Sequence, residues 1–209
     1  LSGRVAFVTG GSRGIGRATV VALAGAGHPV GFCFTADEKG AKETVAAAES
    51  VGGKVLSVRA DVADPSDVDR AFGEVEAAFG PVAVLVNNAG VTRDGLLARM
   101  GDEQWADVIA TNLTGAFNTI RRSTRGMMRA RYGRIVNVSS VSGHMGQSGQ
   151  ANYAAAKAGL VGLSRSVARE LASRNVTCNV VALGPVATAM TESMPDEWRT
   201  AITDEIGRA

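Results

Sequence analysis

The sequence contains few of the residues that mark several common classes of protein. Two cysteines among 209 residues are too few for a disulfide framework, and both lie in strand-like runs, so we expect buried, reduced thiols. Aromatic residues form 5% of the chain, which leaves little material for the stacking platforms of single-stranded nucleic-acid binders. The two histidines, His28 and His144, have no partners at metal-ligand spacing, so we expect no metal site.

Long apolar runs and a strong net charge are also missing. No segment approaches the roughly 20 apolar residues of a membrane-spanning helix, and the first residues show no signal-peptide pattern, so we expect a cytoplasmic protein outside the membrane. The formal net charge of +2 is too balanced to indicate nucleic acid as a partner. Five scattered prolines and the lack of low-complexity tracts mark no boundary, so we expect a single domain over residues 1–209.

Strand-like and helix-like segments alternate along the whole chain. The apolar patterns predict strands at 4–9, 29–34, 54–60, 82–86, 133–139 and 176–182, and helices at 14–26, 38–51, 65–79, 103–130 and 151–173. Because right-handed crossovers place helices on both faces of a parallel sheet, this order predicts an α/β fold with a doubly wound, Rossmann-type sheet. Ligands of such sheets bind at the carboxyl ends of the strands.

The first predicted strand leads directly into a glycine-rich turn and then into a helix. Glycines at such a turn let the backbone approach a pyrophosphate, and the helix N-terminus offers unpaired N–H groups. A plain tight turn is the alternative, but the strand before it and the helix after it favour a dinucleotide site. Its candidate residues are Gly10, Ser12, Arg13, Gly14, Ile15 and Gly16.

Tyr153 and Lys157 stand four positions apart in Tyr-Ala-Ala-Ala-Lys, so they share one face of a helix. An ammonium group beside a phenol favours the phenolate, which should bring the pKa of Tyr153 closer to the range useful for acid/base catalysis. The spacing also arises by chance on amphipathic helices. Ser140, at the end of an apolar run upstream, adds a third polar group to this candidate site.

The glycine turn, the segment 87–90, Asn112, Ser140 and the Tyr153/Lys157 pair together resemble the short-chain dehydrogenase/reductase family over essentially the whole chain. Within that family the chain is most similar to the 3-oxoacyl-acyl-carrier-protein reductases, through 90–100, 150–159 and 179–182. This resemblance implies NADPH-dependent reduction of a carrier-bound 3-oxoacyl thioester in fatty acid biosynthesis, a part of lipid metabolism. Alternatives are a family member that acts on a sugar, steroid or small alcohol, or a nucleotide-binding homologue with weak catalysis.

The resemblance also implies a catalytic tetrad. Tyr153 would donate a proton to the substrate carbonyl, Ser140 would orient that carbonyl, and Lys157 would stabilise the phenolate while it binds ribose hydroxyls. Asn112 would complete the tetrad. An asparagine inside a helical pattern is unfavourable unless its amide is used, here to hold a water molecule that links Lys157 to solvent.

The residue at the tip of the second strand bears on the choice of cofactor. An acid usually stands there in enzymes that read the ribose hydroxyl of NAD, whereas this chain has Thr35, with Arg13 in the glycine turn. We therefore expect NADP(H), although Asp37 and Glu38 follow closely. Further contacts implied by the resemblance are Asp61 and Val62 at the adenine, Asn88, Ala89 and Gly90 at the ribose, and Val186 and Thr188 at the nicotinamide amide.

Arginines are frequent between residues 121 and 134. The plain interpretation is a solvated helix face. The resemblance implies instead an acidic acyl-carrier protein as partner, which a basic rim near the active site would steer by charge, and it points to Arg131 and Arg174. We expect neither nucleic acid nor a membrane as a partner.

Small residues occupy several faces of the predicted helices 103–130 and 151–173, which predicts self-association. The resembled family assembles as a homotetramer built from dimers.

The chain departs from the family pattern near its end. Leu183 stands before Gly184-Pro185, and Ala189 replaces a frequent acid. We expect a substrate lid at about 184–206, and we do not expect the last helix and strand of such enzymes within these 209 residues, whether the chain is truly shorter or continues beyond them.

Overall fold

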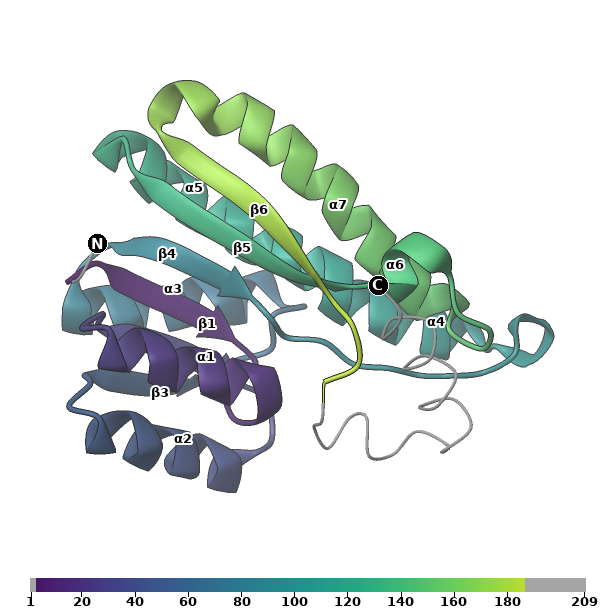
Figure 1. Ribbon diagram of the computed structural model, residues 1–209, viewed down its shortest axis with the longest axis horizontal. Coiled ribbons are helices and arrows are strands. Elements are labelled where there is room, and N and C mark those ends of the chain that lie inside the picture. Colours follow the sequence, from purple (N-terminus) through teal and green to yellow (C-terminus); the bar gives the residue numbers. More distant parts are fainter. Residues whose placement is uncertain (1–2, 187–209) are drawn as a thin grey trace.

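The apolar, β-branched runs of the sequence form the parallel strands of one sheet, and the amphipathic segments between them form helices on both of its faces (Figure 1). The computed structural model describes residues 3–186. The strands are β1 (Val5–Thr9), β2 (Val30–Phe34), β3 (Val55–Arg59), β4 (Val82–Asn87), β5 (Gly133–Ser140) and β6 (Val176–Leu183). The longer helices are α1 (Gly14–Gly25), α2 (Glu38–Ser50), α3 (Pro65–Phe79), α4 (Asp102–Ile109), α5 (Gly115–Ala130) and α7 (Ala151–Leu171), and the short ones are η1 (Leu97–Arg99), η2 (Ala110–Thr114), α6 (Ser142–Met145) and η3 (Ala172–Arg174).

The strands lie in the order β3-β2-β1-β4-β5-β6, with every neighbouring pair parallel. The chain moves outward from β1 to β3 and then returns to the other side of β1 with β4. A reversal of this kind opens a crevice at the carboxyl ends of the two central strands. The order confirms the predicted doubly wound, Rossmann-type sheet.

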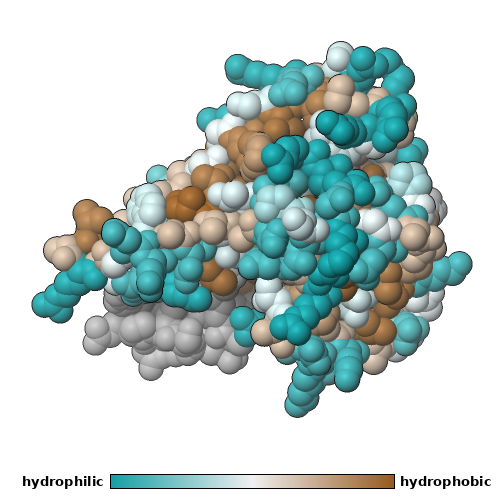
Figure 2. All heavy atoms as spheres, turned by 180° about the vertical axis from the view of Figure 1, so that it is seen from behind, coloured by the Kyte–Doolittle hydropathy of each residue, from teal (hydrophilic) through white to brown (hydrophobic). Residues whose placement is uncertain are grey.

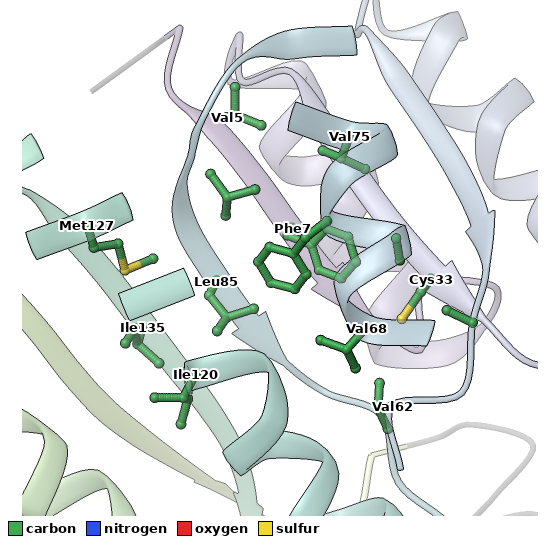
Figure 3. Packing of buried hydrophobic residues seen from close by; sticks show 14 of the residues in the cluster. Val5, Phe7, Cys33, Val62, Val68, Val75, Leu85, Ile120, Met127 and Ile135 are labelled. Atoms are coloured by element: carbon green, nitrogen blue, oxygen red, sulfur yellow. The ribbon is translucent and has the colours of Figure 1, made fainter. Parts of the chain in front are cut away.

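Each face of the sheet carries its own apolar core. On one face, Phe7 of β1 stacks on Phe72 of α3 with ring centroids 4.4 Å apart, and Ile135 of β5 extends the same cluster (Figure 3). On the other face, Phe32 of β2 belongs to a cluster with Val20 of α1. Burial of side chains of this size contributes ~1.5–3 kcal/mol each, so the two cores hold the strands whose polar ends form the site.

A row of buried polar side chains crosses the strands β4 and β5 and joins α5 to α7. The Thr119 hydroxyl donates to Asn87 Oδ1 (2.6 Å), Asn87 Nδ2 donates to Asn137 Oδ1 (2.8 Å), and Asn137 Nδ2 donates to Ser164 Oγ (2.7 Å). Asn137 is fully buried. Because every step is hydrogen-bonded, the row holds both helices in register with β4 and β5 at no cost in unpaired polar groups.

The predicted single helix at 103–130 differs in detail from the structure. Its first part is α4, its last part is α5, and the five residues between them form the π-helix η2, which contains Asn112. A π-helical turn inserts an extra residue into a helix, which changes the side that the following residues face, and such turns are frequent at functional sites. The short helix α6, between β5 and α7, was not predicted either.

Within residues 3–186, no helix is long and apolar enough to cross a membrane. The same part of the chain holds no group of three or more histidine, cysteine or acidic side chains able to bind a metal ion. Thr188, Ala189 and all but the first residues of the expected lid lie outside the described residues.

Candidate active site

A cleft of about 860 Å³ lies at the carboxyl ends of the strands. This volume is within the range of about 300–1,000 Å³ that is usual for small-molecule and cofactor sites. Most of the sequence-predicted site residues line it, from the glycine turn through Thr35, Asp61 and the 88–90 segment to Ser140, Tyr153, Lys157 and Val186. Asn112, Arg131 and Arg174 are not in its wall.

The glycine turn forms one end of the cleft. A Cβ on Gly16 would lie 2.0 Å from the carbonyl oxygen of Gly10, so only glycine permits this approach of the helix to the strand end. Gly10 itself has a φ of 65°, which disfavours any other residue. The start of α1 has no side-chain cap and no acid in its first turn. Its backbone N–H groups therefore suit the pyrophosphate of a dinucleotide, and the turn fits such a cofactor.

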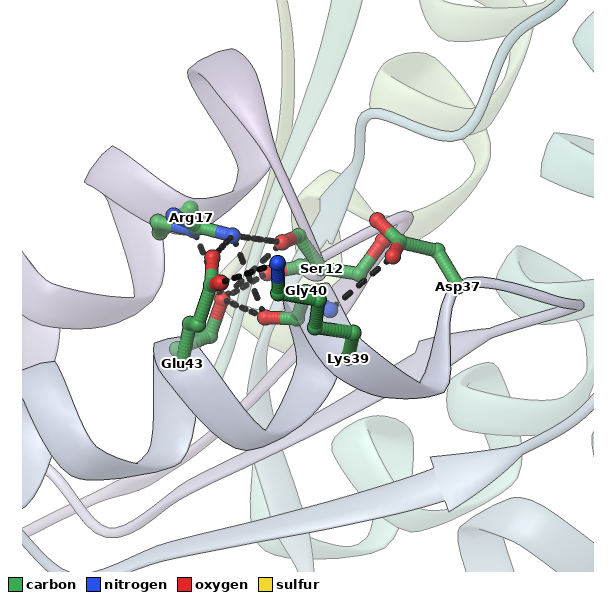
Figure 4. Close-up of polar contacts among 8 residues, drawn as sticks. Ser12, Arg17, Asp37, Lys39, Gly40 and Glu43 are labelled. Carbon is green, nitrogen blue, oxygen red and sulfur yellow. Dashed lines mark hydrogen bonds and ion pairs between the residues drawn. The ribbon is translucent and has the colours of Figure 1, made fainter.

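Arg17 stabilises the glycine turn, and the sequence analysis did not single it out. Figure 4 shows this side chain of α1 reaching over to α2, where its Nη2 lies 2.9 Å from a carboxylate oxygen of Glu43. The same nitrogen donates to the carbonyl oxygens of Ser12 (2.7 Å) and Gly40 (3.2 Å). These bonds fix the turn against α2, so the phosphate-binding backbone is positioned before any ligand arrives.

A second turn, after β4, is tied to the end of β1. The Thr9 hydroxyl accepts the backbone N–H groups of Asn88 and Ala89, both at 2.9 Å, and Asn88 Nδ2 donates to the carbonyl oxygens of Thr9 (3.0 Å) and Gly10 (3.1 Å). The two turns that line the cofactor end of the cleft therefore form one hydrogen-bonded unit.

Tyr153, Lys157 and Ser140 meet at the other end of the cleft. Ser140 ends β5, and the other two residues lie in the first turns of α7, with Lys157 Nζ 5.5 Å from the centre of the tyrosine ring. Lys157 Nζ also donates to the carbonyl oxygen of Val138 (2.8 Å). A Cβ on Gly143 would lie 2.9 Å from the backbone of Lys157, so α6 packs closely on α7 only because this residue is glycine.

The electrostatics of this pair differ from the expectation. Burial raises the pKa of Tyr153, the hydrogen bond with Ser140 opposes that rise, and the nearby Asp94 carboxylate adds to it. Burial also lowers the pKa of Lys157, to about 8. The expected lowering of the tyrosine pKa is therefore wrong for the chain alone, because desolvation, which raises this pKa, is the largest cause of the shift.

Asn112 lies behind this end of the cleft, fully buried in η2. Its Oδ1 accepts the backbone N–H of Val91 (2.8 Å), and its Nδ2 donates to the carbonyl oxygen of the same residue (2.9 Å). Both polar atoms of the amide thus bind the backbone of Val91, whereas we expected the amide to hold a water molecule. The asparagine anchors the segment that follows the 88–90 turn.

The tip of β2 carries the residues that bear on cofactor choice. Thr35 is exposed and lines the cleft, as does Arg13. The Asp37 carboxylate accepts the backbone N–H of Gly40 (2.9 Å) and caps α2, so it is engaged in holding that helix. Arg59, which the sequence did not single out, donates from Nε to the carbonyl oxygen of Thr35 (3.0 Å) and so brings a second cation to this tip.

Arg131 and Arg174 lie away from the cleft. Both residues precede the strands β5 and β6, so they are at the amino ends of the sheet, whereas the cleft is at the carboxyl ends (Figure 1). Arg131 Nη2 donates to the carbonyl oxygen of Ser173 (3.3 Å), and both arginine side chains are exposed. Within one chain, the length of the sheet therefore separates these two arginines from the cleft, and their role in docking stays a prediction.

Comparisons with known proteins bear on the family of the chain. The family described as short chain dehydrogenase matches residues 4–198. The chain is 47% identical to the 3-oxoacyl-acyl-carrier-protein reductase of Escherichia coli over 204 residues, which are 98% of this chain and 82% of that protein. It is 46% identical over 201 residues to the enzyme of the same name from Staphylococcus aureus, covering 96% of this chain and 82% of that one.

A solved structure points to the same family. The crystal structure of a protein described as a short-chain alcohol dehydrogenase, from Sinorhizobium meliloti, matches with a TM-score of 0.92 and 35% identity, over 99% of this chain and 82% of that one. With the glycine turn, the 88–90 turn and the Ser140, Tyr153 and Lys157 cluster in one cleft, the chain belongs to the short-chain dehydrogenase family and is an oxidoreductase that uses a nicotinamide cofactor.

Proposed function

We propose that this protein reduces a 3-oxoacyl thioester, carried by acyl-carrier protein, to its 3-hydroxyacyl form with NADPH, as a cytoplasmic step of fatty acid synthesis. The observation that carries the proposal is the placement of the Tyr153 phenol against Ser140, with Lys157 buried beside it, in the same cleft as the glycine turn. The similarity to reductases of that name supports the choice of substrate.

In this mechanism the residues of the chain handle the proton and the carbonyl. The nicotinamide, when bound, supplies the hydride. Tyr153 donates its phenolic proton to the carbonyl oxygen of the substrate, and the Ser140 hydroxyl holds that oxygen by a hydrogen bond. A phenol of ordinary pKa is protonated at neutral pH, and burial raises the pKa of Tyr153 further, which suits an acid in the reductive direction. Lys157 then stabilises the phenolate that remains, at the 5.5 Å from ring centre to Nζ seen here.

The test is a nicotinamide absorbance assay with an acetoacetyl thioester as substrate. Tyr153→Phe should lower kcat by at least ~10²-fold, the scale for loss of a general acid, while the cofactor still binds. Tyr132→Phe is the matched control, because Tyr132 is the other tyrosine of the chain and its buried hydroxyl has no hydrogen-bond partner within residues 3–186. Retained turnover in Tyr153→Phe would contradict the mechanism. Preference for a sugar, steroid or small alcohol in a substrate panel would keep the mechanism and change the substrate.

The preference for NADP(H) rests on charge at the tip of β2. A phosphate on the ribose would meet the exposed Arg13 and the Thr35 hydroxyl, with Arg59 held beside Thr35. Asp37, which lines the cleft beside Thr35, is occupied as the cap of α2, and Glu38 lies 4.0 Å from Arg59. We expect Arg13→Ala to reduce the ratio of kcat/KM for NADPH over NADH by ~10- to 100-fold, the scale of a charge-assisted hydrogen bond. Equal use of both cofactors by the unmutated protein would show that the acids dominate.

Self-association is part of the same proposal. Ala155, Ala158 and Gly162 share one exposed face of α7, and Phe117 on the neighbouring α5 is 44% exposed. On the side shown in Figure 2, apolar residues form separate patches among polar ones. Gly115 and Ala116, also expected on such a face, are instead buried, and Gly115 packs within the chain against Val62. We propose a homotetramer built from dimers.

Assembly would also explain how Arg131 and Arg174, far from the cleft of their own chain, could serve an active site. A carrier protein bound there faces the amino ends of β5 and β6, so the cleft that it serves would have to belong to a neighbouring subunit. Light scattering tests the assembly, and a monomer at micromolar concentration would contradict it. Arg131→Glu should weaken activity with the carrier-bound substrate and leave activity with a small thioester unchanged. Equal loss with both substrates would exclude docking at this arginine.

A further inference from the structure

The turn after β3, residues 61–63, is held by polar side chains from two helices, and neither side chain has a part in the proposed reaction. Asp61 and Val62 of this turn line the cleft. Because β3 is next to β2 in the sheet, the turn lies on the β2 side of the glycine turn. Residues 61–63 belong to no helix or strand, so their position depends on contacts with the neighbouring elements.

Asn118 of α5 holds this turn from within the protein. Asn118 is 4% exposed, and its Nδ2 donates to the carbonyl oxygens of Val62 (3.0 Å) and Ala63 (3.4 Å). The helix comes this close because residue 115 is glycine: a Cβ on Gly115 would lie 2.5 Å from Val62 Cγ2. Val62 is itself buried in the apolar core around Phe7 (Figure 3). A carbonyl group at this depth is costly to leave without a donor, so the asparagine fixes the backbone of the cleft wall.

Asp67, in the first turn of α3, holds the residue at the start of the same turn. Its Oδ2 accepts the backbone N–H of Asp61 (2.9 Å), and its Oδ1 accepts from Arg70 Nη2 (2.7 Å). Arg70 Nη2 also donates to the carbonyl oxygen of Arg59 (2.7 Å). An ion pair on the surface contributes little by itself, so the bond to the Asp61 N–H is the one that places the wall.

The turn also orients the carboxylate that it presents to the cleft. Asp61 Oδ1 accepts the backbone N–H of Ala63 (2.9 Å). An ionised carboxylate only accepts hydrogen bonds, so it favours the 6-amino group of adenine over the 6-oxo group of hypoxanthine. This discrimination requires the carboxylate to stay in place, because a polar contact selects between two ligands only at hydrogen-bond distance.

The geometry points to Asn118 and Asp67 as positioning residues for the adenine of the cofactor: their hydrogen bonds to the backbone of Val62 and Asp61 fix the wall that reads the base. The inference rests on the proposed binding of NADP(H) with its adenine at these two wall residues. Neither positioning side chain touches the cofactor. Each acts through the backbone that it holds.

The test compares the binding of NADPH with that of its analogue in which hypoxanthine replaces adenine. Fluorescence of the reduced nicotinamide reports both titrations, and no thioester is present. The parent protein should bind NADPH more tightly than the analogue. Asp67→Ala removes the acceptor of the Asp61 N–H at the surface, where the fold should persist, and should reduce the preference for NADPH by ~3- to 10-fold, the scale of one hydrogen bond. Asp67→Asn keeps an oxygen that can accept the same N–H, so it should retain most of the preference.

Two further variants separate this role from general stability. Asn118→Leu removes the buried donor at similar volume and should reduce the preference in the same direction, with urea denaturation as the check on folding. Asp69→Ala is the matched control, because Asp69 pairs with Arg122 (2.6 Å) on the same helix and should leave both affinities unchanged. In the reductive assay, Asp67→Ala should raise KM for NADPH far more than it changes kcat.

Equal weakening of both nucleotides in Asp67→Ala would show a general effect on the turn and would overturn the inference. Equal losses in Asp67→Asn and Asp67→Ala, a comparable change in Asp69→Ala, or a parent protein without preference between the nucleotides would do the same. Failure of the proposed function is recognised separately. A protein that binds NADPH but reduces no 3-oxoacyl thioester would refute the reaction, and the two titrations would still decide whether Asn118 and Asp67 position the wall.

Discussion

Replacement of Asn137 by alanine should be among the most damaging single changes in the protein that leave the cleft untouched. The side chain is fully buried, accepts a hydrogen bond from Asn87 and donates one to Ser164. Loss of two hydrogen bonds removes ~1 kcal/mol each, and the Asn87 amide left without an acceptor adds ~1–3 kcal/mol. We therefore expect the free energy of unfolding to fall by ~3–5 kcal/mol, against ~5–15 kcal/mol for a typical domain.

Urea denaturation measures this change, with a lower midpoint and an unchanged slope expected. Asn179→Ala is the matched control, because Asn179 is an exposed asparagine on the adjacent strand β6, and its loss should cost less than ~0.5 kcal/mol. If the two variants differ by less than ~1 kcal/mol, the buried polar row does not stabilise the sheet as argued.

Three other changes have defined outcomes. Gly16→Ala places a methyl group 2.0 Å from the carbonyl oxygen of Gly10, so cofactor affinity measured by fluorescence titration should fall ~10- to 100-fold, whereas Gly73→Ala, with nothing within 4 Å, should not change it. Thr9→Val leaves two backbone N–H groups without an acceptor and should lower the free energy of unfolding by ~2–4 kcal/mol. Burial lowers the pKa of Lys157 to about 8, so its desolvation penalty is complete below pH 8 and is lost as pH rises toward the usual 10.5. The stability of the parent protein relative to Lys157→Met should therefore rise by ~3 kcal/mol over that interval, and a flat difference would refute the shift.

The sequence was most informative where structure is set locally. Alternation of β-branched runs with amphipathic segments predicted the strands and most helices to within one or two residues, because both periods are properties of neighbouring residues. The glycine turn could be predicted equally well, because its strand and its helix flank it directly in the sequence. Its cleft also gathers residues from the ends of several strands, as a parallel sheet requires.

Contacts between segments that are far apart in the sequence could not be predicted from these local patterns. Asn118 and Val62 are 56 residues apart, and nothing in the spacing around either one indicates that they meet. The π-helical turn carries Asn112, whose side chain is hydrogen-bonded to Val91 in another loop, and the local sequence gives no sign of that contact. The pKa of Tyr153 was misjudged for a related reason: the adjacent lysine is visible in the sequence, but the burial that raises the pKa is not.

The bond between the two halves of the nucleotide pocket has a consequence for how this protein folds. Thr9 and Asn88 are separated by 79 residues, and they meet only after β4 has inserted beside β1. Parallel pairing over such a distance closes a long loop and is slow to form. In a chain in which only β1, β2 and β3 have paired, the glycine turn would lack the 88–90 turn that completes the cofactor end of the cleft. Acquisition of cofactor affinity during refolding would therefore report completion of the central sheet, and a bound cofactor would trap the chain on the native side of that step.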